Sequence, residues 1–102
     1  MLESKFQAGL IKELKKRFEG CIVMKNDAGY IQGIPDLLVL YNDKWAALEC
    51  KRSEADMRKS QDHGNQPYYV ERMNTMSYAS YIYPENKKEV LDDLERTFRT
   101  SR

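Results

Sequence analysis

The sequence predicts an α/β fold in which a mixed four-stranded sheet is flanked by helices, with the elements in the order α-β-β-β-α-β-α. Two observations predict it. Apolar residues recur at helical spacing near both ends of the chain, and between them lie short aliphatic or aromatic runs separated by glycine, asparagine and proline. The length of 102 residues fits one domain, residues 1–102, with a single core.

The composition is that of an ordered globular protein. Hydrophobic residues make up 41% and charged residues 32%, and the net charge of +1 gives no general attraction to nucleic acid. No apolar run approaches the roughly 20 residues that span a membrane, and the N-terminus lacks the apolar segment of a signal peptide. We therefore expect a cytoplasmic protein without membrane association. Cys21 and Cys50 are too few for a disulfide scaffold, so we expect free thiols.

A first helix is predicted over residues 3–18, where apolar residues follow helical spacing and Gly20 provides a stop. Glu3 falls near the middle of the apolar stripe of this helix, and Glu13 falls at its edge. A carboxylate on a core-facing stripe needs a cation, a hydrogen-bond donor or a metal as partner. Both glutamates are therefore candidate functional residues.

Three strands should follow, and the segment NDAGYIQG connects the first to the second. The polar, aperiodic residues 52–65 predict a loop, with or without one helical turn. A second helix begins with QPYYVERMN, in which Gln66 shares the inner face with Val70 and Met73. A fourth strand and a closing helix complete the chain. The predicted strands are 21–25, 35–41, 45–51 and 77–83, and the closing helix is 85–98.

The second and third strands predict a cluster of charged side chains. If Asn42 and Asp43 form a two-residue turn, the numbers of paired residues sum to 85, and Asp36 lies directly opposite Glu49. Their Cβ atoms would then be about 5 Å apart, with Lys51 on the same face. A four-residue turn preserves this register, whereas a three-residue turn would place Asp36 opposite Cys50.

Two facing carboxylates repel each other unless a cation joins them. Mg²⁺, with Mn²⁺ as a substitute, suits an all-oxygen site that is completed by waters and a phosphate. A neighbouring lysine can stabilise charge that develops on a phosphate or hold the attacking water. The alternative is that Asp36 and Glu49 are exposed strand ends and that Lys51 is their salt-bridge partner.

Pro35-Asp36 followed by Glu49-Cys50-Lys51 resembles the signature of the PD-(D/E)XK nucleases. The helix with its glutamate, GIPDLLVLY, ALECK, the polar loop, the helix that opens with glutamine and the aromatic strand resemble the virus-type replication-repair nuclease (VRR-NUC) branch, which phages carry as a stand-alone domain. The resemblance covers nearly the whole chain. It implies a restriction-endonuclease-like core and, if the chain is phage-encoded, action in the host cell cytoplasm.

The resemblance also implies roles for individual residues. Asp36 and Glu49 would be metal ligands, with the backbone carbonyl of Cys50 as a third ligand, and Lys51 would be the catalytic lysine. Glu3 would be the glutamate of the first helix, with Glu13 as its rival. The motif glutamine would be Gln66, with Gln61 as its rival.

Three functions follow as hypotheses. The first is a Mg²⁺-dependent DNA endonuclease that is selective for branched or Holliday-junction DNA, because nothing in the sequence resembles a base-reading module. The second is a catalytically silent nucleic-acid-binding or scaffolding subunit of the same fold, and the third is a small interaction module. Tyr30, in the connection before Asp36, is a candidate contact to nucleic acid.

We also expect a homodimer, because the two opposed cuts that resolve a junction require two sites. The expected interface is an exposed aromatic surface. It would consist of Tyr68, Tyr69, Tyr78, Tyr81, Tyr83 and Phe98.

Overall fold

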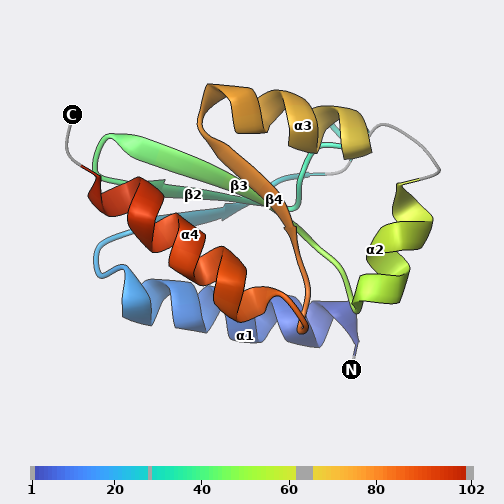
Figure 1. The fold of residues 1–102 in the computed structure, drawn as a ribbon, viewed down its shortest axis with the longest axis horizontal. Coiled ribbons are helices and arrows are strands. Elements are labelled where there is room, and N and C mark those ends of the chain that lie inside the picture. The colour runs from blue at the N-terminus through green and yellow to red at the C-terminus, as the bar shows by residue number, and fades with distance from the viewer. Residues whose placement is uncertain (1, 28, 62–65, 101–102) are drawn as a thin grey trace.

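The computed structural model describes residues 2–27, 29–61 and 66–100, with the side chain of Gln66 also outside the description. Its element order is α1 (Glu3–Arg17), β1 (Ile22–Lys25), β2 (Leu37–Tyr41), β3 (Lys44–Cys50), α2 (Glu54–Ser60), α3 (Gln66–Met76), β4 (Tyr78–Ile82) and α4 (Lys87–Arg99). The four strands form one mixed sheet in the order β1-β2-β3-β4 (Figure 1). The predicted fold class is confirmed.

The sheet is antiparallel from β1 to β3 and parallel between β3 and β4. The hairpin of β2 and β3 turns at Asn42 and Asp43, and Tyr41 pairs with Lys44. Asn42 has a φ of 56°, a left-handed conformation that asparagine tolerates better than most residues. The predicted two-residue turn and its register are therefore confirmed.

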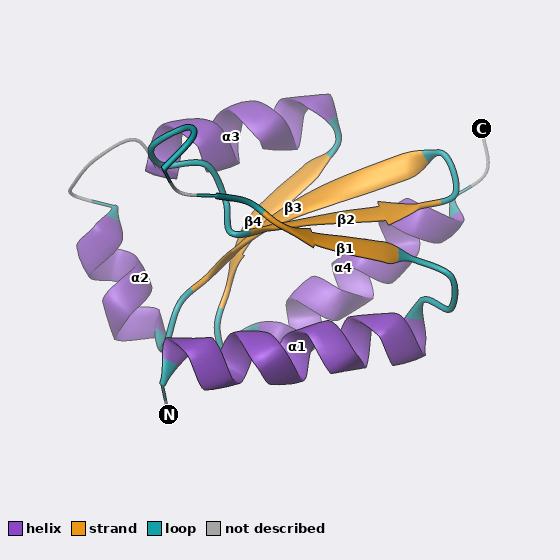
Figure 2. Cartoon of the chain, turned by 180° about the vertical axis from the view of Figure 1, so that it is seen from behind, coloured by secondary structure: helices purple, strands orange, loops and turns teal. Residues whose placement is uncertain are grey.

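Helices cover the sheet unequally on its two faces. α1 and α4 lie on one face and α3 lies on the other, while α2 stands at one end of the sheet, beside the start of α1 (Figures 1 and 2). The larger core lies under α1 and α4, where these helices pack against the inward residues of β2, β3 and β4. Its members from the two helices are Phe6, Leu10, Leu14, Val90, Leu91, Leu94 and Phe98.

The short helix α2 occupies part of the segment that was predicted as a loop. Ser53 caps it by accepting a hydrogen bond from the backbone N–H of Asp56, at 3.2 Å between Oγ and N. Glu54 and Arg58 form an ion pair one turn apart, at 2.6 Å between Oε2 and Nη2. No residue of α2 is buried, so the apolar periodicity that reveals other helices is missing here.

The predicted aromatic surface was wrong. Tyr81, Tyr83 and Phe98 are buried within the protomer, and Tyr69 and Tyr78 are half-buried. Of the six aromatic residues only Tyr68 is exposed. Phe98 and Tyr78 pack in the larger core, and Tyr81 and Tyr83 pack in a smaller one with Ala47, Val70 and Ala79. The six rings therefore do not provide a reason to expect a dimer. Within the described part of the chain, no helix combines the length and the apolar character needed to cross a membrane.

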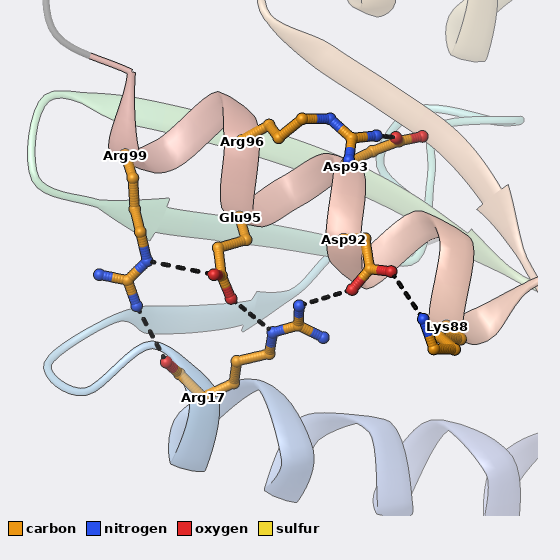
Figure 3. A network of polar contacts seen from close by, with 7 residues as sticks. All are labelled: Arg17, Lys88, Asp92, Asp93, Glu95, Arg96 and Arg99. Carbon is orange, nitrogen blue, oxygen red and sulfur yellow. Dashed lines mark hydrogen bonds and ion pairs between the residues drawn. The ribbon is translucent and has the colours of Figure 1, made fainter.

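Charged side chains join the end of α1 to α4. Arg17 donates from Nε to Glu95, at 2.9 Å, and from Nη2 to Asp92, at 2.8 Å (Figure 3). Arg99 reaches back to the backbone carbonyl of Arg17, at 3.5 Å. The hydrogen bond from Arg17 holds the pKa of Asp92 below its usual range, with a further contribution from Lys88. This network closes the side of the core that lies away from α2.

Replacing Arg17 with methionine keeps an apolar stem but removes the guanidinium. We expect Arg17→Met to lower the free energy of unfolding, measured by urea denaturation at pH 7, by about 1 kcal/mol. The matched control is Lys88→Met, which removes an exposed pair within α4 and should have a smaller effect. The cost of Arg17→Met should shrink as the pH falls through the lowered pKa of Asp92, because the protonated carboxyl no longer attracts the guanidinium. If both variants lower the free energy of unfolding equally, the contacts of Arg17 do not stabilise the packing of α1 against α4.

Candidate active site

Two hydrogen bonds join Asp36 and Glu49 to each other's strands, at the point where β2 begins and β3 ends. The backbone N–H of Asp36 donates to Oε1 of Glu49, at 3.1 Å, and the backbone N–H of Cys50 donates to Oδ2 of Asp36, at 3.0 Å. Each carboxylate thus accepts a hydrogen bond from the strand opposite its own. The register that pairs Leu37 with Leu48 places Asp36 opposite Glu49, as the sequence predicted.

Lys51 completes this cluster. Its Nζ lies 3.2 Å from Oε2 of Glu49, and its side chain is only 14% exposed. The backbone N–H of Lys51 donates to the carbonyl of Ile82, at 2.9 Å, which fixes the chain beyond the end of β3 to β4. Both the ammonium group and its backbone are therefore held at the site.

Asn26 holds Asp36 from the other side. Its backbone N–H donates to the carbonyl of Asp36, at 2.8 Å, and its side-chain amide donates to the carbonyl of Pro35, at 2.7 Å. Pro35 itself is fully buried. Asn26 was not predicted from the sequence, although it follows the first strand directly and an antiparallel register places it opposite Asp36.

Burial makes the two carboxylates difficult to ionise. The Glu49 side chain is 2% exposed, and burial together with the charge of Asp36 raises its pKa to about 7. Burial also raises the pKa of Asp36, against the opposing effects of the Cys50 N–H and of Lys51. One ammonium group does not offset the cost of two buried carboxylates, so the site favours a proton or a further cation.

Glu3 belongs to the same electrostatic cluster. It lies in the first turn of α1, and its pKa is raised by partial burial and by the nearby charge of Asp36, against the opposing charge of Lys51. The rival Glu13 is bound elsewhere, because its Oε1 lies 3.0 Å from Nζ of Lys87 on α4. Glu3 is therefore the glutamate of α1 that the fold brings to the site.

A second residue of α1, Gln7, also contacts the site and was not predicted from the sequence. Its side chain hydrogen-bonds the thiol of Cys50, whose pKa burial raises to about 12. Gln7 follows Glu3 by four residues and so lies on the same helical face, which is the signal that could have revealed it. The buried, protonated thiol is a packing group, so the backbone of Cys50 is the part that can serve the site.

The two candidate glutamines lie at the end of α2 and at the start of α3. Gln61 is exposed at the C-cap of α2. Gln66 is the first residue of α3, and its side chain lies outside the described part of the structure. The choice between them stays a prediction.

The oxygen atoms of Asp36, Glu49 and the Cys50 carbonyl are the kind of ligand that a hard divalent cation prefers. A strand residue directs its N–H and C=O toward the same neighbouring strand, so the N–H that Cys50 gives to Asp36 places the Cys50 carbonyl on the side of the carboxylates. Among the described residues, no group of three or more His, Cys, Asp or Glu side chains is arranged to hold a metal. Two carboxylates and a carbonyl nevertheless match Mg²⁺, which commonly takes one or two carboxylates and completes its shell with waters and a substrate phosphate.

The raised pKa of Glu49 predicts how stability depends on pH in the presence of a chelator. Between pH 4.5 and about 7 the folded protein holds a proton that the unfolded chain has lost, so the free energy of unfolding should fall as the pH rises through this window. The shift corresponds to roughly 3 kcal/mol.

Glu49→Gln cannot titrate, so it should gain stability relative to the wild type, by roughly that amount, as the pH is raised from 5 to 8. Urea denaturation across this range measures the difference. The matched control is Glu13→Gln, which alters a half-buried ion pair away from the site and should follow the wild-type profile. Parallel profiles for the wild type and Glu49→Gln would show that Glu49 ionises normally.

In comparisons with known proteins, no family model matches the chain, no curated protein matches it, and no solved structure matches it. The resemblance to the PD-(D/E)XK nucleases therefore stays a prediction from the sequence motifs. The support for a function comes from the arrangement of Asp36, Glu49 and Lys51.

Proposed function

We propose that this protein is a Mg²⁺-dependent DNA endonuclease of the PD-(D/E)XK type, similar to the VRR-NUC branch, that hydrolyses phosphodiester bonds in branched DNA such as Holliday junctions. One observation carries the proposal. Asp36 and Glu49 accept hydrogen bonds from each other's strands, and the ammonium group of Lys51 lies 3.2 Å from Glu49. Two carboxylates can hold a divalent cation, and a lysine beside them can oppose the charge that develops on an attacked phosphate.

Each residue of the site would have a separate role in hydrolysis. Asp36, Glu49 and the carbonyl of Cys50 would hold the ion, which would polarise the phosphodiester and activate the attacking water. Lys51 would donate a hydrogen bond to a phosphate oxygen and so oppose the negative charge that develops there. Glu3, next to Asp36 and Lys51, would orient the attacking water through a hydrogen bond.

Selectivity for DNA structure is the better fit than selectivity for sequence. No segment of these 102 residues resembles a base-reading module. The net charge of +1 also gives little general affinity for long duplexes. An enzyme of this kind would gain its selectivity from the shape of the substrate at the site.

A second candidate is a catalytically silent DNA-binding or scaffolding subunit of the same fold. Two observations favour it. The described residues contain no group of three or more metal-binding side chains, and Lys51 already provides a cation to Glu49. In this case the three charged residues would be a structural ion cluster.

Incubation of the purified protein with a labelled four-way DNA junction separates the two candidates. The nuclease should cleave the junction with Mg²⁺ or Mn²⁺ and should bind it without cleavage in Ca²⁺. Asp36→Asn, which keeps the shape of the side chain, should lower cleavage by at least about a hundredfold while the protein stays folded. Binding without cleavage in any metal would support the silent subunit.

Lys51→Ala tests the division of roles in the same assay. It should lower cleavage severely and leave Mn²⁺ affinity, measured by calorimetry with DNA present, within a few-fold of the wild type. Glu49→Gln should lower both. A loss of metal affinity in Lys51→Ala as large as that in Glu49→Gln would mean that the lysine maintains the metal site and does not act on the phosphate.

A homodimer remains part of the proposal on functional grounds alone, because resolution of a junction needs two opposed cuts. The buried aromatic rings do not supply its interface. Light scattering at micromolar concentration, with and without junction DNA, should give a protein mass of twice the 12.0 kDa chain, after the mass of the DNA is subtracted, in at least the DNA-bound state. A single-chain mass in both states would exclude the dimer.

A further inference from the structure

The connection from β1 to β2 is a loop that closes on Asp36. Asn26 ties its two ends together through the hydrogen bonds to Pro35 and Asp36. In Figures 1 and 2 this connection lies on the face of the sheet that carries α3. The loop therefore begins and ends at the backbone that positions a proposed metal ligand.

Internal hydrogen bonds brace the described part of this loop. The Asp27 side chain accepts the N–H of Gly29, at 2.8 Å, and the Asp27 carbonyl accepts the N–H of Tyr30, at 3.0 Å. Ile34 donates to the carbonyl of Ile31, at 3.4 Å. The first two bonds join Gly29 and Tyr30 to Asp27, the neighbour of Asn26, and the third bond closes a turn after Tyr30.

Tyr30 differs from the apolar residues that follow it in the loop. Its side chain is 84% exposed, the highest value among the exposed large hydrophobic residues that the structure describes. Ile31 and Ile34 are half-buried, and Pro35 is fully buried. The second half of the loop is thus anchored to the protein, while the tyrosine ring stays in solvent, where it adds nothing to the core.

The position of Tyr30 limits what its ring can reach. Tyr30 is four residues from Asn26, which hydrogen-bonds the backbone of Asp36. The Cα atoms of Tyr30 and Asn26 are therefore at most about 14 Å apart. Neighbouring nucleotides in one strand are spaced by about 3.4 Å along a duplex. The ring can therefore meet a base within about four nucleotides of a phosphate held at Asp36 and Glu49.

We propose that Tyr30 stacks on an unpaired or branch-point base within about four nucleotides of the scissile phosphate and thereby gives the enzyme its preference for branched DNA. The inference rests on the proposed nuclease function. A tyrosine ring recognises the face of any base and not its sequence. Within a continuous duplex each base face is covered by its neighbours, whereas a branch or a frayed end leaves a face open.

Fluorescence anisotropy in Ca²⁺ measures this contact without cleavage. The probes are a labelled four-way junction, a splayed-arm substrate and a linear duplex that shares the arm sequence. Tyr30→Ala should weaken binding to both branched probes by about ten- to a hundredfold and leave the duplex within twofold. Tyr30→Phe retains the ring and should bind as the wild type does. Met76→Ala, which truncates a side chain that is 61% exposed at the far end of α3, is the matched control and should change nothing.

A 2-aminopurine base at the branch point provides a direct signal of stacking, since its fluorescence should be quenched by the wild type and by Tyr30→Phe but not by Tyr30→Ala. The inference is overturned if Tyr30→Ala binds branched DNA as the wild type does, if it loses affinity for the linear duplex equally, or if Tyr30→Phe is as weak as Tyr30→Ala.

The outcomes separate this inference from the proposed function. A wild type that cuts the junction while Tyr30→Ala binds it unchanged refutes the stacking contact alone. A wild type that binds no DNA refutes both. If the wild type binds but never cuts, and Tyr30→Ala loses the branched probes, stacking holds and the endonuclease proposal fails.

Discussion

The reciprocal hydrogen bonds between Asp36 and the strand that carries Glu49 determine the rest of the site. Each acidic side chain accepts a backbone N–H from the opposite strand, so two groups that repel each other are held in a fixed cross-strand pair. The pairing depends on the two-residue turn at Asn42, because a turn longer by one residue would place Asp36 opposite Cys50. The turn, the register and the acidic pair therefore form one structural unit.

The surrounding elements hold the two carboxylates close together although their charges repel each other. Asn26 fixes the backbone of Asp36, and β4 fixes the backbone of Lys51, so neither group can move far to relieve the repulsion. The buried position of Glu49 raises its pKa to about 7, even with the ammonium group of Lys51 beside it. A fold that needed only stability would gain from neutral side chains here. The proposed binding of a cation and a phosphate at this place would account for the charges.

The sequence was informative wherever a regular period or a turn rule applied. Alternation along β2 and β3 and the turn at Asn42 were enough to place Asp36 opposite Glu49. Helical spacing brought Glu3 to the side of α1 near Asp36 and Lys51, but its side chain is exposed and does not lie in the core-facing stripe. The sequence was uninformative where tertiary contacts decide. Register and helical spacing place Asn26 opposite Asp36 and Gln7 on the face of Glu3, but they do not say which partners these side chains bind. The helix α2 is held by a Ser53 cap and charge pairs without any buried residue. The aromatic residues were assigned to a surface because composition does not distinguish an interface from the core of a small domain.

The titration of the Glu49 carboxyl tests the central claim most directly. Carbon-13 NMR of the labelled side chain would follow its protonation with pH, first with a chelator and then with Mg²⁺. We predict an apparent pKa near 7 in the chelator, and a clear decrease when Mg²⁺ is added, because the ion displaces the proton. A pKa near the usual 4.5, or a titration curve that Mg²⁺ does not move, would contradict the assignment of Asp36 and Glu49 as a metal-binding pair.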